Sequence, residues 1–146
     1  MHVKFLPLLL VLLLVSALAA AQSDDKPFAE AFIVLQLSDA DAAAQARVVD
    51  VASNLVKHYG GPDFVDIEVV AFGPGLSLLY PGHPQQERIV SLLASGVLFV
   101  VCRNTMETIE RKTGKRPELI AAAETVQTGV AHLVQRATEG YVVIRP

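Results

Sequence analysis

The chain has 146 residues and a formal net charge of −3 at pH 7, from 12 Lys and Arg against 15 Asp and Glu. This mildly acidic balance gives no reason to expect a nucleic-acid partner, because binding to a phosphate backbone depends on clustered basic residues. A single cysteine excludes an internal disulfide, and an apolar content of 52% is enough for a core that is held together by packing.

The N-terminal segment predicts a secretory signal peptide. A short basic start precedes an apolar stretch at 6–15, and three alanines at 19–21 form a small-residue cleavage site. We expect cleavage after Ala21, which leaves 22–146 as one domain in the periplasm or outside the cell. The apolar stretch is short for a membrane span, which needs about 20 residues, so we expect no membrane attachment after cleavage. An uncleaved anchor is the alternative.

Strands and helices are predicted to alternate along the rest of the chain. Apolar runs indicate strands at 31–37, 65–72, 97–101 and 141–144, and alternation indicates a short edge strand at 124–127. Amphipathic segments between capping and stopping residues indicate helices from Asp41 to Gly60, Pro84 to Gly96, Asn104 to Gly114, and Thr128 to Gly140. The Gly- and Pro-rich segment 73–84 predicts a shaped loop rather than regular structure. The short segment 119–123 is ambiguous between helix and extended chain.

The sequence also predicts a cap for one helix and the buried face of another. Asn104, with Glu107 three positions on, is predicted to cap its helix. For the last helix, periodicity predicts an inward apolar face and an outward polar face. The inward residues are Val130, Leu133, Val134 and Ala137, and the outward residues are Gln135, Arg136 and Glu139.

Strands that alternate with helices through short links are typical of parallel βαβ units. We therefore expect an α/β fold, a three-layer sandwich with helices on both faces of a parallel sheet. Binding sites in such sheets lie outside the carboxyl ends of the strands. Four loops are predicted to meet there, at 38–41, 73–84, 102–105 and 128–132.

Cys102 is the first candidate for chemistry at this edge, since it lies between a strand and a helix. The helix dipole and the free N–H groups of the first turn favour a thiolate, which is a nucleophile and a sulfur carrier. The alternative is a small apolar side chain that only fills the end of a strand, because free cysteine is often buried. Both interpretations remain open from the residues alone.

Six other residues are candidates for contacts with a substrate. Asn104 and Thr105 follow the cysteine, and their amides and side chains can hold an anion. Gly73 and Gly75 give a wall at which backbone N–H groups can approach it. Thr128 and His132 come from the first turn of the last helix, where His132 is either a base for the thiol or a solvated helix residue. No histidine spacing indicates a metal site, and no cofactor is predicted.

Four segments together resemble the DsrE/DsrF-like family. They are Val-Ala-Phe-Gly-Pro-Gly at 70–75, Gly-Val-Leu-Phe-Val-Val-Cys-Arg-Asn-Thr-Met at 96–106, Gln-Thr-Gly-Val-Ala-His-Leu at 127–133, and Gly-Tyr-Val-Val-Ile-Arg-Pro at 140–146. The resemblance implies a three-layer α/β/α domain with a five-stranded, mostly parallel sheet, and a homo-oligomer, often a trimer or hexamer. It also implies a persulfide on the cysteine at position 102, in a relay with a sulfur donor and a sulfur acceptor protein.

The sequence thus supports a first hypothesis of an exported sulfur-handling protein in which Cys102 carries sulfane sulfur. The family's relay members are cytoplasmic, whereas this chain has a predicted export signal. A second hypothesis is a non-catalytic homo-oligomeric binding module in which Cys102 is structural. A third is a redox sensor that uses a disulfide between subunits. Whether the protein turns over a substrate as an enzyme is left open.

Overall fold

The computed structural model describes residues 26–120 and 123–146. The predicted signal peptide, the first residues of the predicted domain and positions 121–122 lie outside these ranges. The strands are β1 (Ala31–Leu37), β2 (Val65–Ala71), β3 (Leu98–Cys102), β4 (Glu124–Val126) and β5 (Val142–Ile144). The α-helices are α1 (Ala42–His58), α2 (Gln86–Ala94), α3 (Arg103–Thr113) and α4 (Gly129–Thr138), with 3-10 helices η1 (Pro62–Phe64) and η2 (Gly73–Leu79).

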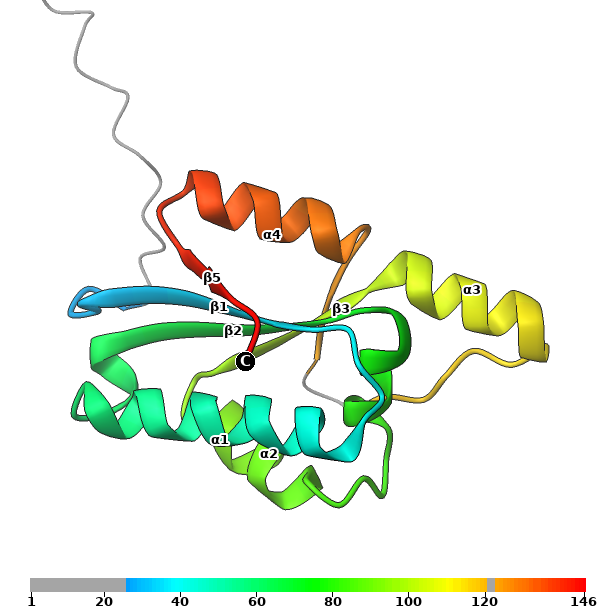
Figure 1. Ribbon diagram of the computed structural model, residues 1–146, viewed down its shortest axis with the longest axis horizontal. Coiled ribbons are helices and arrows are strands. Elements are labelled where there is room, and N and C mark those ends of the chain that lie inside the picture. The colour runs from blue at the N-terminus through cyan, green and yellow to red at the C-terminus, as the bar shows by residue number, and fades with distance from the viewer. Residues whose placement is uncertain (1–25, 121–122) are drawn as a thin grey trace, which may run out of the picture.

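The five strands form one sheet in the order β4-β3-β2-β1-β5, and every neighbouring pair is parallel. Helices α1 and α2 cover one face, α4 lies over the other, and α3 projects beyond the carboxyl ends of the strands (Figure 1). The predicted three-layer α/β sandwich is therefore confirmed, with a sheet that is parallel throughout.

The core is unequal on the two faces. The face under α1 and α2 carries the larger cluster of buried apolar side chains, with Leu35, Ile67 and Phe99 from the three central strands. The face under α4 has a small cluster of Val34, Val70, Val100, Leu133 and Tyr141. Helix α4 thus rests on much less apolar surface than α1. No helix among 26–120 and 123–146 is long and apolar enough to cross a membrane.

Local signals explain most of the element boundaries, with three departures. The Asp41 carboxylate accepts the N–H of Ala44 at 2.9 Å and caps α1. Segment 73–79 is a 3-10 helix, so the prediction of an irregular loop there was wrong. Strand β3 runs one residue further than predicted and includes Cys102, which takes the N-cap position of α3. The predicted cap by Asn104 was therefore wrong.

Helix α4 is rotated relative to the prediction from its apolar residues. Val130 and Val134 were predicted to face inward, but they are 52% and 61% exposed. Leu133 is buried as predicted, and Arg136 reaches a buried carboxylate on β2 instead of facing solvent. The physical reason is that β2 presents the Glu68 side chain to this helix, and Arg136 and His132 turn toward it.

Candidate functional site

Cys102 ends β3 at the carboxyl edge of the sheet and is directly followed by α3. The residue is buried, with 6% of its surface exposed. Its thiol donates to the carbonyl oxygen of Gln127 across 3.8 Å, in the segment between β4 and α4. Gly129 packs against the same side chain, because an added Cβ there would lie 3.3 Å from the Cβ of Cys102. The sulfur is thus enclosed between the first residues of α3 and α4.

Hydrogen-bond donors around this sulfur favour its ionised form. Burial by itself raises the pKa of the Cys102 thiol, since a thiolate is poorly solvated there. The N–H of Gly129, the hydroxyl and N–H of Thr105, and the N–H of Asn104 act in the opposite direction. Together they outweigh burial, so the pKa of Cys102 lies below its ordinary value. The predicted effect of a helix N-terminus is present here, supplied by two helices instead of one.

Thr105 is held by the first residue of η2, the 3-10 helix that follows β2. The N–H of Gly73 donates to Thr105 Oγ1 at 2.9 Å, which leaves the threonine hydroxyl proton for the sulfur. Gly73 has a φ of +54°, a left-handed conformation in which side chains other than glycine are strained. Its N–H therefore orients a donor to the sulfur and is not itself directed at a substrate.

Asn104 and Thr128 lie beside the sulfur in a polar network between the starts of α3 and α4. The Asn104 amide donates to Thr128 Oγ1 at 3.0 Å and accepts from Gln127 Nε2 at 2.6 Å. Its N–H also lies 3.2 Å from the Gln127 carbonyl oxygen. These bonds connect the two helix N-termini that supply the donors, and they replace the predicted capping role of Asn104.

A cavity of about 430 Å³ opens next to this network. It is lined by Gly73, Pro74, Tyr80, Asn104, Thr105, Thr108, Ile109 and Lys112. Cys102 is not among the lining residues, although two of the three residues that donate to its sulfur, Asn104 and Thr105, are. Thr105, Thr108, Ile109 and Lys112 have the i, i+3, i+4, i+7 spacing of one helix face, which presents one cation and two hydroxyls to the cavity. The ammonium group of Lys112 is a group that can attract an anion.

Gly75 and His132 serve other contacts. A Cβ on Gly75 would lie 2.5 Å from the carbonyl oxygen of Leu37, so glycine is needed there for close packing of the backbone. His132 Nε2 lies 2.7 Å from Glu68 Oε2, and its side chain is only 11% exposed. The interpretation of His132 as a solvated residue was therefore wrong. Its ring binds Glu68, on β2.

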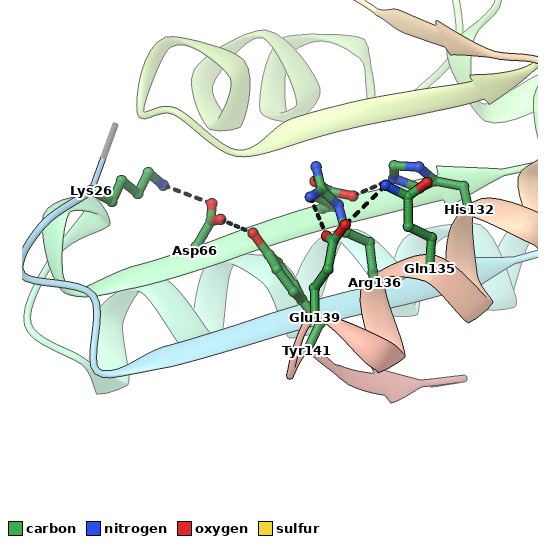
Figure 2. Close-up of polar contacts among 8 residues, drawn as sticks. Lys26, Asp66, His132, Gln135, Arg136, Glu139 and Tyr141 are labelled. Carbon is green, nitrogen blue, oxygen red and sulfur yellow. Dashed lines mark hydrogen bonds and ion pairs between the residues drawn. The ribbon is translucent and has the colours of Figure 1, made fainter. Parts of the chain in front are cut away.

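The Glu68 contact belongs to a buried charge network under α4. Glu68 Oε1 lies 2.6 Å from Arg136 Nη2, and Arg136 also pairs with Glu139. Figure 2 shows that His132 and Arg136 leave α4 on the side that faces the sheet. Burial lowers the pKa of Arg136, but hydrogen bonds with Glu139 and Glu68 raise it above its ordinary value, so the guanidinium stays charged.

A second part of the network joins the start of β2 to the last strand. Asp66 accepts from the hydroxyl of Tyr141 and lies 3.7 Å from Lys26 Nζ (Figure 2). Burial, followed by the contact with Asp66, raises the pKa of Tyr141, so its hydroxyl remains a donor. Within the described ranges, no group of three His, Cys, Asp or Glu side chains is placed to hold a metal ion.

Sequence reasoning missed several residues of the site. Gln127 had no signal, because its role depends on backbone and amide contacts with positions more than 20 residues away. A sequence signal did exist for Thr108, Ile109 and Lys112, because they continue the helical face that starts at Thr105. Glu68 lies within the strand predicted at 65–72, and its burial gave no local signal.

The all-parallel five-stranded sheet with helices on both sides is an α/β fold, and comparison with solved structures indicates a DsrE/YchN-like fold. No family model and no curated protein matches the chain. The fold is similar to that of MTH1491 from Methanobacterium thermoautotrophicum, described as a protein of unknown function, with 29% identity and a TM-score of 0.70 over 80% of this chain and 100% of that chain. It is also similar to the ychN protein from E. coli, with 15% identity and a TM-score of 0.60 over 79% of this chain and 97% of that one. At 15% identity the second likeness concerns the fold alone.

Proposed function

We propose that the protein handles sulfur, with the Cys102 thiolate accepting a sulfane sulfur as a persulfide and passing it to a partner protein. The observation that carries this proposal is the position of the buried Cys102 between the first residues of α3 and α4, where groups of Gly129, Thr105 and Asn104 lower the pKa of the thiol although burial raises it. A cysteine that only packs needs no such donors. The adjoining cavity, with Lys112 and two threonine hydroxyls in its lining, suits a small anionic donor such as thiosulfate.

The proposed chemistry is two successive displacements at sulfur. The Cys102 thiolate attacks the outer sulfur of thiosulfate, the new S–S bond forms, and sulfite leaves with the electron pair of the broken bond. A thiolate of the acceptor protein then attacks the outer sulfur of the persulfide, and Cys102 leaves as the thiolate. No external oxidant or reductant is consumed. The donors that stabilise the thiolate also stabilise it as a leaving group in the second step.

Intact-mass spectrometry after incubation with thiosulfate or polysulfide tests this proposal. We expect the wild type to gain the mass of one sulfur atom, and the gain to be reversed by a small thiol acceptor. The Cys102→Ser variant is the matched control and should gain nothing. An unmodified Cys102 that also resists alkylation would overturn the proposal.

A second candidate function is a non-catalytic homo-oligomeric binding module in which Cys102 is structural. It is favoured by the low exposure of Cys102 and by the absence of this residue from the cavity lining. In that case Cys102→Ser keeps partner binding intact, and thiol reagents label the native protein slowly. A binding assay with wild type and Cys102→Ser separates the two functions.

We also propose that the protein is exported and acts as a homo-oligomer, a trimer or hexamer. The support for export is the signal-like segment at 1–21, and the support for assembly is the resemblance of the four quoted segments to an oligomeric family. Cell fractionation with N-terminal sequencing of the mature chain tests the first point. Light scattering of the purified protein tests the second.

A further inference from the structure

Helix α4 connects the sulfur site to the charge network. Its first residue, Gly129, packs on Cys102 and Phe72 and directs its N–H to the sulfur. His132 and Arg136 follow three and seven positions later on the same helix, and both bind Glu68. Since an α-helix behaves as a short rigid rod, with a rise of about 1.5 Å per residue, the position of Gly129 depends on what holds the rest of the helix.

Apolar packing alone holds α4 weakly. Of its apolar side chains, only Leu133 is buried, whereas Val130 and Val134 are more than half exposed. One buried side chain can fix a point of the helix against the sheet, but it leaves rotation and tilt about that point free. The hydrogen bond between Asn104 and Thr128 holds the residue before the helix, and a further anchor along the helix is needed to fix its rotation and tilt.

Glu68 supplies this further anchor. Its side chain is 1% exposed, and each carboxylate oxygen meets a different residue of α4, at 2.7 Å from His132 and 2.6 Å from Arg136. His132 and Arg136 are four positions apart and therefore share one face of the helix. Burial of such charges costs free energy, and specifying one geometry is an attested reason to keep a buried ion pair.

We infer that Glu68 is a positioning residue for the thiolate site: through His132 and Arg136 it sets the rotation of α4 and so holds the Gly129 N–H at the sulfur of Cys102. The inference rests on the proposed function only in what the thiolate is used for. The role of Glu68 can be tested separately, because the pKa of the Cys102 thiol is measurable without any sulfur donor. A cavity of about 440 Å³ adjoins this anchor and is lined by Glu68, Arg136 and Tyr141 among others, so side chains do not fill all the space beside it.

The sign of one effect separates positioning from direct electrostatics. Glu68 is in register with Leu98, four residues before Cys102 on the neighbouring strand, which places the two about 13 Å apart along the sheet. A carboxylate acting through space disfavours a thiolate, so its removal lowers the pKa of the thiol. Loss of a positioned N–H donor raises that pKa instead. The two mechanisms therefore predict opposite shifts.

The test uses Glu68→Gln, which keeps the shape of the side chain and removes its charge. Alkylation of the full-length protein by iodoacetamide, measured as a function of pH, gives the pKa of Cys102. We expect this pKa to rise by about half to one unit, which slows alkylation about three- to tenfold at a pH below the wild-type pKa. The matched control is Glu139→Gln, which removes another acid from Arg136 but does not touch the link to β2, and it should leave the pKa of Cys102 unchanged.

An unchanged or lowered pKa in folded Glu68→Gln overturns the inference. If that variant does not fold, His132→Leu, which has no donor for Glu68, removes one arm of the anchor and leaves Arg136 in place, and a smaller shift in the same direction is expected. No shift in His132→Leu then counts against the inference. A wild type that alkylates rapidly but takes no sulfur from thiosulfate overturns the proposed function and leaves the role of Glu68 intact.

Discussion

Replacement of Thr105 by valine tests directly whether donors to the sulfur create the thiolate. The change removes the hydroxyl that faces Cys102 and keeps the shape of the side chain and its backbone N–H. A hydrogen bond to a charged group contributes about 1.5–3 kcal/mol, and a shift of one pKa unit corresponds to about 1.4 kcal/mol. Sulfur is a weaker acceptor than oxygen, so we take the lower end and expect the pKa of Cys102 to rise by about one unit.

The shift can be measured from the ultraviolet absorbance of the thiolate as a function of pH, with the rate of iodoacetamide alkylation as a second readout. Thr105→Ser keeps the hydroxyl and should restore most of the wild-type pKa. Thr108→Val is the matched control, because Thr108 lines the same cavity one turn further along α3 and contacts Arg111, not the sulfur. An unchanged or lower pKa in Thr105→Val would refute the reasoning.

Three further predictions concern stability, each measured by urea denaturation. Because Cys102 has a pKa below its ordinary value of 9.0 in the folded state, the unfolded chain binds more protons just below that pH. The Cys102→Ser variant lacks this ionisation and serves as the reference. The unfolding free energy of the wild type, relative to this variant, should therefore rise with pH up to about 9 and should lose this contribution as the pH falls through the folded-state pKa of Cys102. A difference in unfolding free energy that does not change with pH contradicts the lowered pKa. Gly75→Ala should destabilise the fold by about 1–3 kcal/mol, since the new methyl group meets the carbonyl of Leu37, and a loss below about half a kcal/mol would show that the backbone yields easily. Tyr141→Phe should cost about 1–3 kcal/mol because it takes a donor from the buried Asp66, and an equal stability of the two proteins would mean that water replaces the hydroxyl.

The sheet and the location of the site followed from the sequence because their signals are local. A strand that is buried on both faces has to be an apolar run, as at 97–101, and a parallel sheet brings the ends of such strands to one edge. Cys102 lies at that edge, together with Asn104, Thr105 and the loop after β2. These features depend on which residues are neighbours in the chain, so periodicity and the βαβ rule are sufficient to find them.

The orientation of α4 did not follow, because it depends on a contact between distant positions. Hydrophobic periodicity turns Val130 and Val134 inward, whereas the structure turns His132 and Arg136 toward Glu68, 64 positions before His132. The rule that charged side chains face solvent fails when a buried carboxylate, here Glu68, binds polar side chains of the helix that covers it. In the same way Asn104 exchanged a local cap for an amide network with Gln127, 23 positions away.

The strand order has a consequence for the sequence of events during folding. Strand β1 lies between β2, the next strand along the chain, and β5, the last, so that Ile33 pairs with Val142 and Leu35 with Ile144. Until the final residues have been synthesised, one edge of β1 has no partner, and the sheet is completed by the most distant segment of the chain. Such non-local pairing slows folding, because the two ends of a long segment must lose conformational entropy in coming together before any stabilising contact forms between them. The sheet of this protein is therefore complete only after β5 has paired with β1. A truncation that removes β5 exposes an edge of β1, a central strand.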